Sequence, residues 1–426
     1  MEKEKLKGEI VVKEEERVAN LEDLKKSIQD LLSQDTSLIL KKILAGAIFL
    51  NSSDLHFEPK EKEVLLRIRL DGLLYPVFVF PSKTYKEILL RLKMLSGMKI
   101  NITDRPQDGR FTILADSREV EIRSSCLLSE WGESFVARIL DPLNLRSLND
   151  LGLRDDLLSL FQREIKRPHG MIIVTGPTGS GKTTTLYAFL SEIKRPEIKI
   201  ITIENPIEYR LTGIVQTQVE PGKDYDFSNG LRAIMRQDPD VVLVGEIRDL
   251  ETAELALQAS LTGHLVLSTL HTNDATGVVS RFLSLGAKPF HIAPALKLVV
   301  AQRLVRRICQ KCKVLKEIDS LSLDIMKKIL DNIKGINVSP KTKIAFPKGC
   351  KECNFTGYKG RIGVFEAFQV DSEMEGLILK APSSSLLRKK AREKGMITLL
   401  QDGLLKVLKQ ITTMEEVEKT IGFFED

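Results

Sequence analysis

The segment MIIVTGPTGSGKTTTLY at residues 171–187 decides the fold of this chain of 426 residues. A short apolar run leads into a glycine-rich turn that fits the spacing GxxxxGK[ST] and opens a helical pattern. Glycines let the backbone approach phosphate oxygens, and the start of the helix adds a favourable dipole. Lys182 supplies a cation to the phosphates, and the Thr183 hydroxyl is a ligand for Mg²⁺. The predicted nucleotide-binding loop consists of Gly176, Pro177, Thr178, Gly179, Ser180, Gly181, Lys182, Thr183 and Thr184.

Apolar runs of the same kind recur after this segment. The stretches KIITIE (199–204), DVVLVGE (240–246) and HLVLSTL (264–270) alternate with helical patterns. Continuous apolar strands between helices are typical of a parallel sheet covered on both faces, so the predicted fold class is α/β. Before the segment, alternating stretches such as VLLRIRLDG (64–72) and REVEIRSS (118–125) predict half-buried strands of a small α+β domain.

Composition and pattern together predict the domain organisation. Hydrophobic residues make up 42% of the chain and charged residues 29%, which excludes a wholly disordered protein. No apolar run approaches the roughly 20 residues needed to span a bilayer, so we expect any membrane role to be peripheral. The predicted parts are a charged leader (1–36), an α+β N-terminal domain (37–141), a linker (142–153), an α/β core (154–302), a tetracysteine module (303–360) and a helical C-terminal domain (361–426).

Carboxylates occupy the ends of two apolar runs. Glu246 ends DVVLVGE, and Glu204 and Glu208 belong to ITIENPIE. A carboxylate at the carboxyl end of a parallel strand faces the ligand crevice. We therefore predict that Glu204 and Glu246 are catalytic together with Lys182, one carboxylate near the metal and one on the attacking water. Taken singly, each glutamate is also consistent with a solvated strand end.

Two histidines, His264 and His271, bracket the strand pattern HLVLSTLHT. A histidine at the phosphate end of this strand can hydrogen-bond the γ-phosphate. The alternative is that both residues are polar caps of one strand.

Four of the five cysteines form two CxxC pairs, Cys309 with Cys312 and Cys350 with Cys353. The small, odd number argues against a disulfide framework and fits a reducing compartment. Four thiolates can close a tetrahedral Zn²⁺ shell, which is a structural site. A redox dithiol pair and free buried cysteines are the alternatives. Cys126 stands alone and is expected to be a buried apolar residue.

The order of several longer motifs resembles the secretion-superfamily ATPases of the type II secretion and type IV pilus assembly branch. The resemblance runs from about residue 37 to the C-terminus and includes SSDLHFEP (52–59), DRPQDGR (104–110), GLRAIMRQDPDVVLVGEIRD (230–249) and LTGHLVLSTLHTNDA (261–275). It implies a RecA-like P-loop core that uses ATP and Mg²⁺. The tetracysteine pattern favours the assembly branch, because members that retract pili lack it.

The resemblance implies roles for individual residues. The matching boxes are the Walker A loop 176–183, Glu204 and Glu208 of the aspartate box, the Walker B acid Glu246, and the histidine-box residues His264 and His271. Asn205 stands where the family usually has an aspartate, which removes one carboxylate and leaves two. Together with Glu208, the two histidines complete the expected ATP contacts.

Family members work as hexamers in which a neighbouring subunit caps the ATP. Arginines of the N-terminal domain are therefore expected to neutralise charge on the γ-phosphoryl group. The candidates are Arg67, Arg110, Arg123 and Arg138, with a salt-bridged strand arginine as the alternative for each. Arg236 and Arg248 are further candidates for the same interface.

The implied function is that of a cytoplasmic homohexameric ATPase, peripheral to the inner membrane. It would drive assembly of a type IV pilus or a type II secretion pseudopilus through an inner-membrane platform protein and the cytoplasmic domains of the apparatus. The basic run at 303–313 is consistent with an anionic lipid surface or with a solvated face. Secretion and pilus members share all of these motifs, so the sequence does not separate them.

Two other classes of function stay open from the sequence. One is a RecA-like nucleic-acid motor, but a net charge of +6 and only 6% aromatic residues count against nucleic acid as a partner. The other is a non-catalytic scaffold gated by nucleotide.

Overall fold

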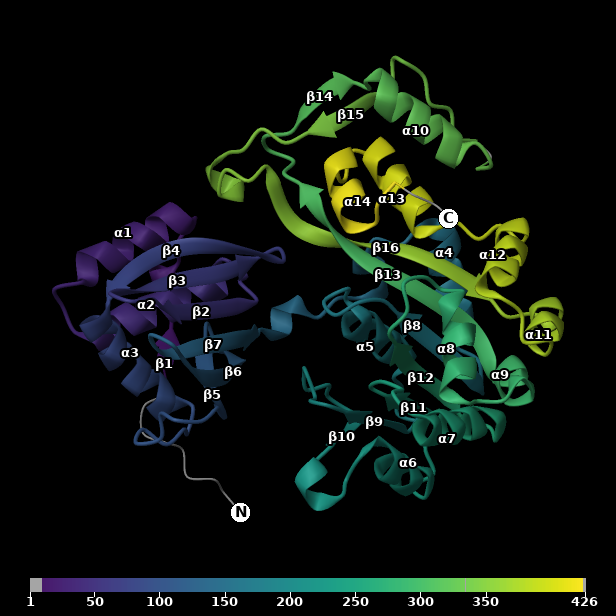
Figure 1. Ribbon diagram of the computed structural model, residues 1–426, viewed down its shortest axis with the longest axis horizontal. Coiled ribbons are helices and arrows are strands. Elements are labelled where there is room, and N and C mark those ends of the chain that lie inside the picture. Colours follow the sequence, from purple (N-terminus) through teal and green to yellow (C-terminus); the bar gives the residue numbers. More distant parts are fainter. Residues whose placement is uncertain (1–9, 334, 424–426) are drawn as a thin grey trace. The chain divides into compact units, whose positions relative to one another are not determined.

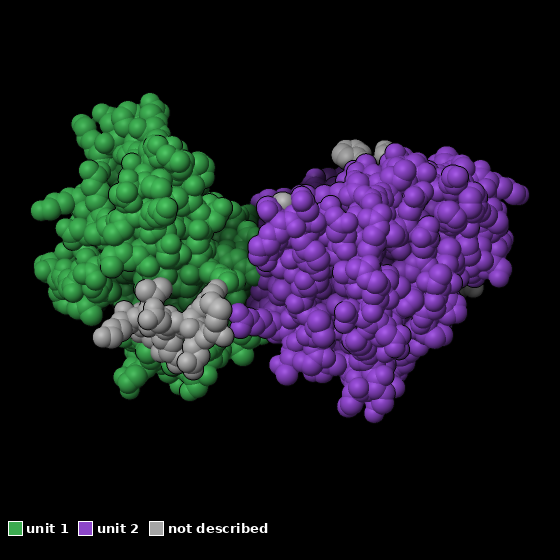
Figure 2. Space-filling model, turned by 90° about the horizontal axis from the view of Figure 1, so that it is seen from below, with its two compact units in different colours: residues 1–144, 309–313, 347–360 green, residues 145–308, 314–346, 361–426 purple. Residues whose placement is uncertain are grey.

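The computed structural model describes residues 10–333 and 335–423. The chain forms two compact units, which Figure 2 shows in different colours. Unit 1 comprises residues 1–144, 309–313 and 347–360, and unit 2 comprises residues 145–308, 314–346 and 361–426. The four paired cysteines therefore belong to unit 1 by their contacts, although the chain segments that connect them belong to unit 2.

Unit 1 is built on a seven-stranded sheet with the order β1-β5-β6-β7-β2-β3-β4 (Figure 1). Its strands are β1 (Ile10–Val12), β2 (Asp54–Pro59), β3 (Glu63–Leu70), β4 (Leu73–Pro81), β5 (Gln107–Ala115), β6 (Arg118–Ser129) and β7 (Gly132–Leu140). Burial alternates along β3, so one face of the sheet covers a core. The helices that contribute to this core are α1 (Leu21–Leu31), α2 (Thr36–Phe49) and α3 (Ser82–Leu95).

The structure differs from the charged leader predicted over residues 1–36. Residues 1–9 lie outside the described part of the chain, but β1 pairs in parallel with β5 and buries Val12 completely. Asn20 caps α1, which buries Leu24 and Ile28 in the core of unit 1. The many charged residues of this segment conceal its contribution to the core, because only one side of each element is apolar.

Unit 2 is built on a second seven-stranded sheet with the order β10-β9-β11-β12-β8-β13-β16 (Figure 1). Its strands are β8 (Gly170–Thr175), β9 (Ile200–Glu204), β10 (Val215–Gln218), β11 (Val241–Val244), β12 (Leu265–Leu270), β13 (Leu296–Ile308) and β16 (Tyr358–Gln369). The pairings from β10 to β13 are parallel. The strands β8, β9, β11 and β12 are buried at every residue, as their apolar runs predict.

Helices cover both faces of this sheet, which confirms the α/β fold class. One face packs against α4 (Asp155–Glu164) and α5 (Lys182–Ile193). The helices on the other face are α6 (Phe227–Met235), α7 (Leu250–Leu261), α8 (Gly277–Leu285) and α9 (Pro289–Ala295).

Two predicted boundaries fall inside strands. The boundary after residue 302 lies within β13, and the boundary after residue 360 lies within β16. The part predicted to be helical therefore begins with a strand of the core sheet. Its helices follow as α11 (Ser372–Ile378), α12 (Ser384–Glu393), α13 (Leu399–Leu408) and α14 (Met414–Thr420). None of the described helices is both long and apolar enough to cross a membrane.

A small insertion separates the two cysteine pairs. It consists of β14 (Val314–Glu317), α10 (Ser320–Leu330) and β15 (Lys343–Phe346), with β14 and β15 antiparallel. The sequence pattern predicts α10 but does not reveal the two short strands.

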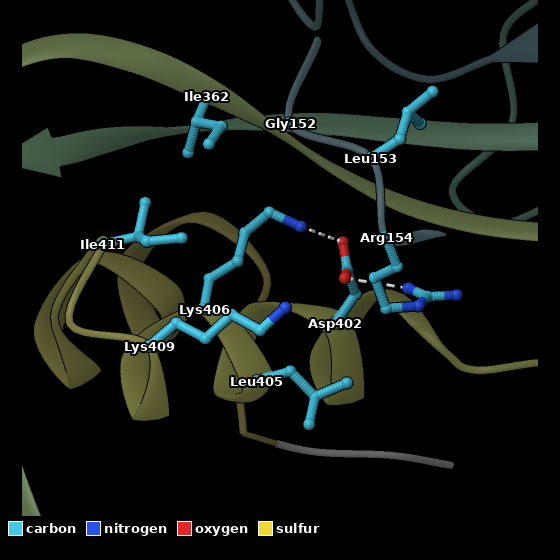
Figure 3. Close-up of a pocket in the computed structure, with 9 residues that line it drawn as sticks. All are labelled: Gly152, Leu153, Arg154, Ile362, Asp402, Leu405, Lys406, Lys409 and Ile411. Carbon is cyan, nitrogen blue, oxygen red and sulfur yellow. Dashed lines mark hydrogen bonds and ion pairs between the residues drawn. The ribbon is translucent and has the colours of Figure 1, made fainter. Parts of the chain in front are cut away.

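The end of the linker predicted over 142–153 is anchored in unit 2. It lines a pocket of about 110 Å³ with residues of β16 and α13 (Figure 3). Inside, Arg154 Nη1 lies 2.8 Å from Oδ1 of the buried Asp402, and Lys406 Nζ donates to Oδ2 over 2.6 Å. A buried carboxylate requires such partners, so these contacts tie the start of α4 to α13.

Candidate active site

The predicted nucleotide loop lies between β8 and α5, at the carboxyl edge of the parallel sheet. Gly176, Gly179 and Gly181 have φ values of 149°, 79° and 88°, in the region that favours glycine. A Cβ atom on Gly176 would also lie only 2.5 Å from the carbonyl oxygen of Gln302. The loop backbone thus has the freedom and closeness that a phosphate cradle of N–H groups requires.

Lys182 begins α5, and its side chain turns back onto the loop. Its Nζ donates to the carbonyl oxygens of Gly176 and Pro177 over 2.9 and 3.0 Å. Burial lowers the pKa of this ammonium group, while Glu246 acts in the opposite direction. Ser180 Oγ is buried without a hydrogen-bond partner among the described residues. Both side chains fit a bound phosphate, because each has a donor that can turn to its oxygens.

The open side of the loop carries its other predicted members. Pro177, Thr178 and Gly179 are exposed, and so is Thr183 in the first turn of α5. The exposed hydroxyl of Thr183 could therefore hold Mg²⁺ without first leaving a buried position.

Glu246 follows β11 and lies on the same side of the sheet as Lys182. Its Oε1 is 2.7 Å from Arg248 Nη2, and its Oε2 is 3.7 Å from His271 Nε2. Burial and the charge of Lys182 lower the pKa of His271, so this imidazole is mainly neutral at pH 7. Glu246, His271 and Lys182 therefore form one electrostatic cluster beside the phosphate loop.

The structure separates the two predicted histidines. The six residues of β12 lie between them, a distance of about 20 Å along a strand. His264 is at the amino edge of the sheet, where its Nδ1 lies 3.0 Å from the carbonyl oxygen of Ala259. Only His271 is at the carboxyl edge, next to the loop. His264 thus has the position of a strand cap, as the alternative interpretation predicts, and lies away from the phosphate loop of its own chain.

Glu204 lies at the end of β9, and its exposed fraction is only 3%. Thr202 Oγ1 donates to its Oε1 over 2.6 Å, and the hydroxyl of Tyr187 donates to its Oε2. Burial raises the pKa of this carboxyl group, and the two hydrogen bonds oppose that effect. Glu204 is therefore held in the interior, whereas Glu208 is half-buried in the segment after β9.

Two residues of β13 adjoin the loop and were not predicted from the sequence. Thr185 Oγ1 donates to Gln302 Oε1 over 2.7 Å, which braces α5. Arg303 Nη2 donates to the carbonyl oxygen of Asn273 over 2.7 Å, and its charge lowers the pKa of Lys182 after the larger effect of burial. The register of β13 on β8 brings these residues to the loop, and no local sequence pattern shows that pairing.

This position of Arg303 changes the interpretation of the basic run at 303–313. A second cation of the run, Arg306, pairs with the buried Glu416. Lys311 Nζ lies 2.6 Å from a carboxylate oxygen of Glu352. Three cations of the run therefore have protein partners, which weakens the prediction of a lipid-binding face.

Three of the four arginine-finger candidates form a row across unit 1. Arg110 on β5 is opposite Arg123 on β6, which is opposite Arg138 on β7. Like charges at opposed positions repel each other. Asp54 lies 3.1 Å from Arg138, and Glu121 lies 3.1 Å from Arg123. Arg110 is exposed and has no ion pair within the described ranges, so in this arginine row (Arg110, Arg123 and Arg138) it is the member whose charge has no partner there.

The remaining arginine candidates have partners of their own. Arg67 on β3 donates to Glu58 on β2, as the salt-bridge alternative predicts. Arg248 pairs with Glu246, and Arg236 Nη1 donates to the carbonyl oxygen of Arg232 over 3.1 Å.

The four paired cysteines converge in unit 1, where their sulfur atoms all lie within 4.8 Å of one another. The Sγ atoms are 3.9 Å apart for Cys309 and Cys350, 3.8 Å for Cys312 and Cys353, and 3.7 Å for Cys350 and Cys353. A tetrahedron with Zn–S bonds of about 2.3 Å has S···S edges of about 3.8 Å, so the donor set fits one Zn²⁺. The separate Cys126 is buried, as predicted, and burial raises its pKa to about 12.

Backbone groups support one thiolate of this cluster. The N–H groups of Cys350 and Gly357 donate to Cys353 Sγ over 3.2 and 3.3 Å. Burial opposes ionisation, but these hydrogen bonds lower the pKa of Cys353 to about 7. The thiolate is the form that binds a metal ion.

Comparison with known proteins agrees with this arrangement. The profile of a family described as "Type II/IV secretion system protein" matches residues 32–419. The type II secretion system ATPase E of Vibrio cholerae is 45% identical over 395 residues, which cover 91% of this chain and 76% of the relative. The type IV pilus assembly ATPase PilB of Myxococcus xanthus is 39% identical over 413 residues, which cover 96% and 71%.

Solved structures include a similar protein with nucleotide. The pilus retraction motor PilT with bound ADP is 26% identical to this chain, with a TM-score of 0.59 and coverage of 91% of this chain and 97% of PilT. The family profile covers most of the chain, and the relatives match nearly all of it. The chain therefore belongs to the family of type II/IV secretion system proteins.

Proposed function

We propose that this chain is an ATPase that works as a homohexamer and powers assembly of a type II secretion pseudopilus or a type IV pilus. The observation that carries the proposal is the glycine loop at the carboxyl edge of the parallel sheet, with Lys182 folded onto it and Glu246 beside it. Relatives matching more than 90% of this chain are named ATPases of both systems. The family gives no support to the alternative of a nucleic-acid motor.

The residues at the loop suit phosphoryl transfer from ATP to water. The loop and Lys182 would hold the phosphates, and Thr183 would be the protein ligand of a Mg²⁺ ion that neutralises charge on their oxygens. Glu246 would accept a hydrogen bond from the attacking water as the bond to the bridging oxygen breaks. A neutral His271 can donate to the γ-phosphate. We therefore assign water activation to Glu246, because the interior position of Glu204 keeps it from solvent.

We also propose that the arginine row acts on ATP bound by a neighbouring subunit. The exposed guanidinium of Arg110 favours an anion, and a guanidinium remains charged at any physiological pH. In the same scheme, the tetracysteine cluster holds a structural Zn²⁺. Motion driven by hydrolysis would pass to a platform protein on the cytoplasmic side of the inner membrane.

Phosphate release by the purified chain tests the proposal. With ATP and Mg²⁺ we expect turnover that rises when anionic vesicles carrying the cytoplasmic domain of the platform protein are added. Turnover that rises with single-stranded DNA instead would identify a nucleic-acid motor. A folded hexamer that binds ATP without hydrolysing it would identify a nucleotide-gated scaffold.

A further inference from the structure

A buried tyrosine links the phosphate-loop helix to the segment that carries Glu208. Tyr187 lies one helical turn beyond Thr183 on α5, and 1% of it is exposed. Its hydroxyl donates to Oε2 of Glu204. The ring of Tyr187 also packs edge-on against the ring of Tyr209, with the ring centroids 6.4 Å apart. This side chain therefore joins α5, the end of β9 and the segment 205–211.

A glutamine holds the same segment from the other side. Gln216 of β10 donates through Nε2 to Glu204 Oε1 over 3.3 Å and to the carbonyl oxygen of Tyr209 over 3.0 Å. Its Oε1 accepts from the N–H of Leu211 over 2.7 Å. The carboxylate of Glu204 is thus the centre of a network that fixes both ends of the segment. Such a buried network is rigid only when each of its members is satisfied.

We propose that Tyr187 and Glu204 are positioning residues, which together fix the segment 205–211 and so set the position of Glu208, one of the expected ATP contacts. The proposal rests on the proposed function, because Glu208 matters only if ATP binds there. It also gives Glu204 a role that differs from the catalytic one predicted from the sequence. With three donors on its two oxygens, Glu204 has little capacity left for a water molecule.

The surroundings of Glu204 make hydrogen bonding, and not charge, its main contribution. The ionisable groups that face it are Tyr187 on α5 and Glu208 in the segment after β9. From β11, the neighbouring residue is Gly245, and α6 packs against β9 with apolar residues such as Leu231. An amide at position 204 could keep hydrogen bonds to the same partners, since its oxygen accepts and its nitrogen donates to the tyrosine oxygen.

Steady-state kinetics of the full hexamer can test this assignment with Glu204→Ala, Glu204→Gln and Tyr187→Phe. Misplacing a reacting group by about 1 Å can cost about 10²-fold in rate. We expect Glu204→Ala and Tyr187→Phe to lower kcat by about 10- to 100-fold with a small change in KM. Glu204→Gln should recover most of the loss caused by Glu204→Ala. Tyr225→Phe is a matched control, because its hydroxyl contacts Thr217 at the same sheet edge.

Hydrogen exchange supplies a second readout that does not depend on turnover. Amides of the segment 205–211 should exchange faster in Tyr187→Phe than in Tyr225→Phe, while β8 stays protected. The proposal is overturned if Glu204→Gln is as inactive as Glu204→Ala, since charge is then required. It is also overturned if Tyr187→Phe matches the wild type in kcat and exchange. Absence of turnover in the wild-type hexamer would instead overturn the proposed function, and the exchange result would still decide whether the network fixes the segment.

Discussion

The phosphate loop of unit 2 and the arginine row of unit 1 belong to sheets with the same number of strands. The phosphate loop follows the end of a strand, whereas the arginine row lies in the middle of its strands. In unit 2 the parallel strands are buried on both faces, so polar side chains that meet a ligand are confined to the carboxyl edge. In unit 1 the strands β5, β6 and β7 are antiparallel neighbours, and the arginines stand opposite one another in mid-strand. The proposed function therefore depends on where the strands end in one sheet and on cross-strand register in the other.

The largest expected effect is at the edge of the parallel sheet. Lys182→Ala should lower ATP turnover by at least about 10³-fold, because it removes a preorganised cation from the phosphates. Phosphate release measures the loss, and circular dichroism checks the fold. Lys194→Ala, at the other end of the same helix, is the control and should keep normal turnover. Normal turnover in Lys182→Ala would place the reaction elsewhere.

The arginine row should show a smaller effect that depends on assembly. Arg110→Ala should lower kcat by about 10²-fold, because two arginines of the row remain. Arg105→Ala is the control, since that exposed arginine pairs with Asp104 outside the row.

Mixed hexamers distinguish action on a neighbouring subunit from action within one subunit. Mixing the impaired Arg110→Ala and Lys182→Ala chains should restore part of the turnover, because some interfaces then combine an intact loop with an intact arginine. Turnover that stays at the level of the separate variants would show that both residues act within the same subunit.

Metal removal should affect the cysteine module while both sheets persist. Elemental analysis should find about one zinc per chain, and Cys353→Ser should reduce it, because a structural site needs all four thiolates. Limited proteolysis should then cut within 347–357 before it cuts either sheet. Cys126→Ser provides the control, since this thiol lies apart from the cluster and should leave the zinc content unchanged.

The smallest expected effect concerns the pH dependence of stability. Burial raises the pKa of Glu204 in the folded chain, so its contribution to stability is present below the ordinary glutamate pKa of about 4.3 and is lost as the pH rises through the folded value. Glu204→Gln does not titrate. The melting temperature of this variant relative to the wild type should therefore increase from about pH 5 to pH 8. A difference that is independent of pH would show that Glu204 keeps its ordinary pKa when folded.

Much of the candidate site can be predicted from the sequence because its chemistry is local. The loop from Gly176 to Thr183 has consecutive residues whose spacing itself builds the cradle. Each CxxC pair is local in the same way, and two pairs predict the four-thiolate cluster that the structure contains. Glu246 can be predicted as a site residue because an apolar strand pattern ends at this position.

Other members of the site depend on pairings between distant segments. Arg303 and Gln302 reach the loop only because β13 adds to the sheet beside β8. The two histidines flank the same strand and look equivalent in the sequence. The whole length of β12 lies between them, so they stand at opposite edges of the sheet. In the sequence, Tyr187 resembles the other apolar residues of α5. Its hydrogen bond at the end of β9 becomes apparent only in the tertiary structure.

The sequence by itself determined the fold class, the phosphate loop and the four cysteines of the cluster, because apolar strand patterns, glycine conformations and CxxC spacing are properties of short segments. Only the tertiary structure decided that residues 10–36 join the sheet and helices of unit 1, that His271 and not His264 adjoins the loop, and that Glu204 is held in the interior. Burial and cross-strand register arise from the packing of segments far apart in the chain. No window of sequence contains that information.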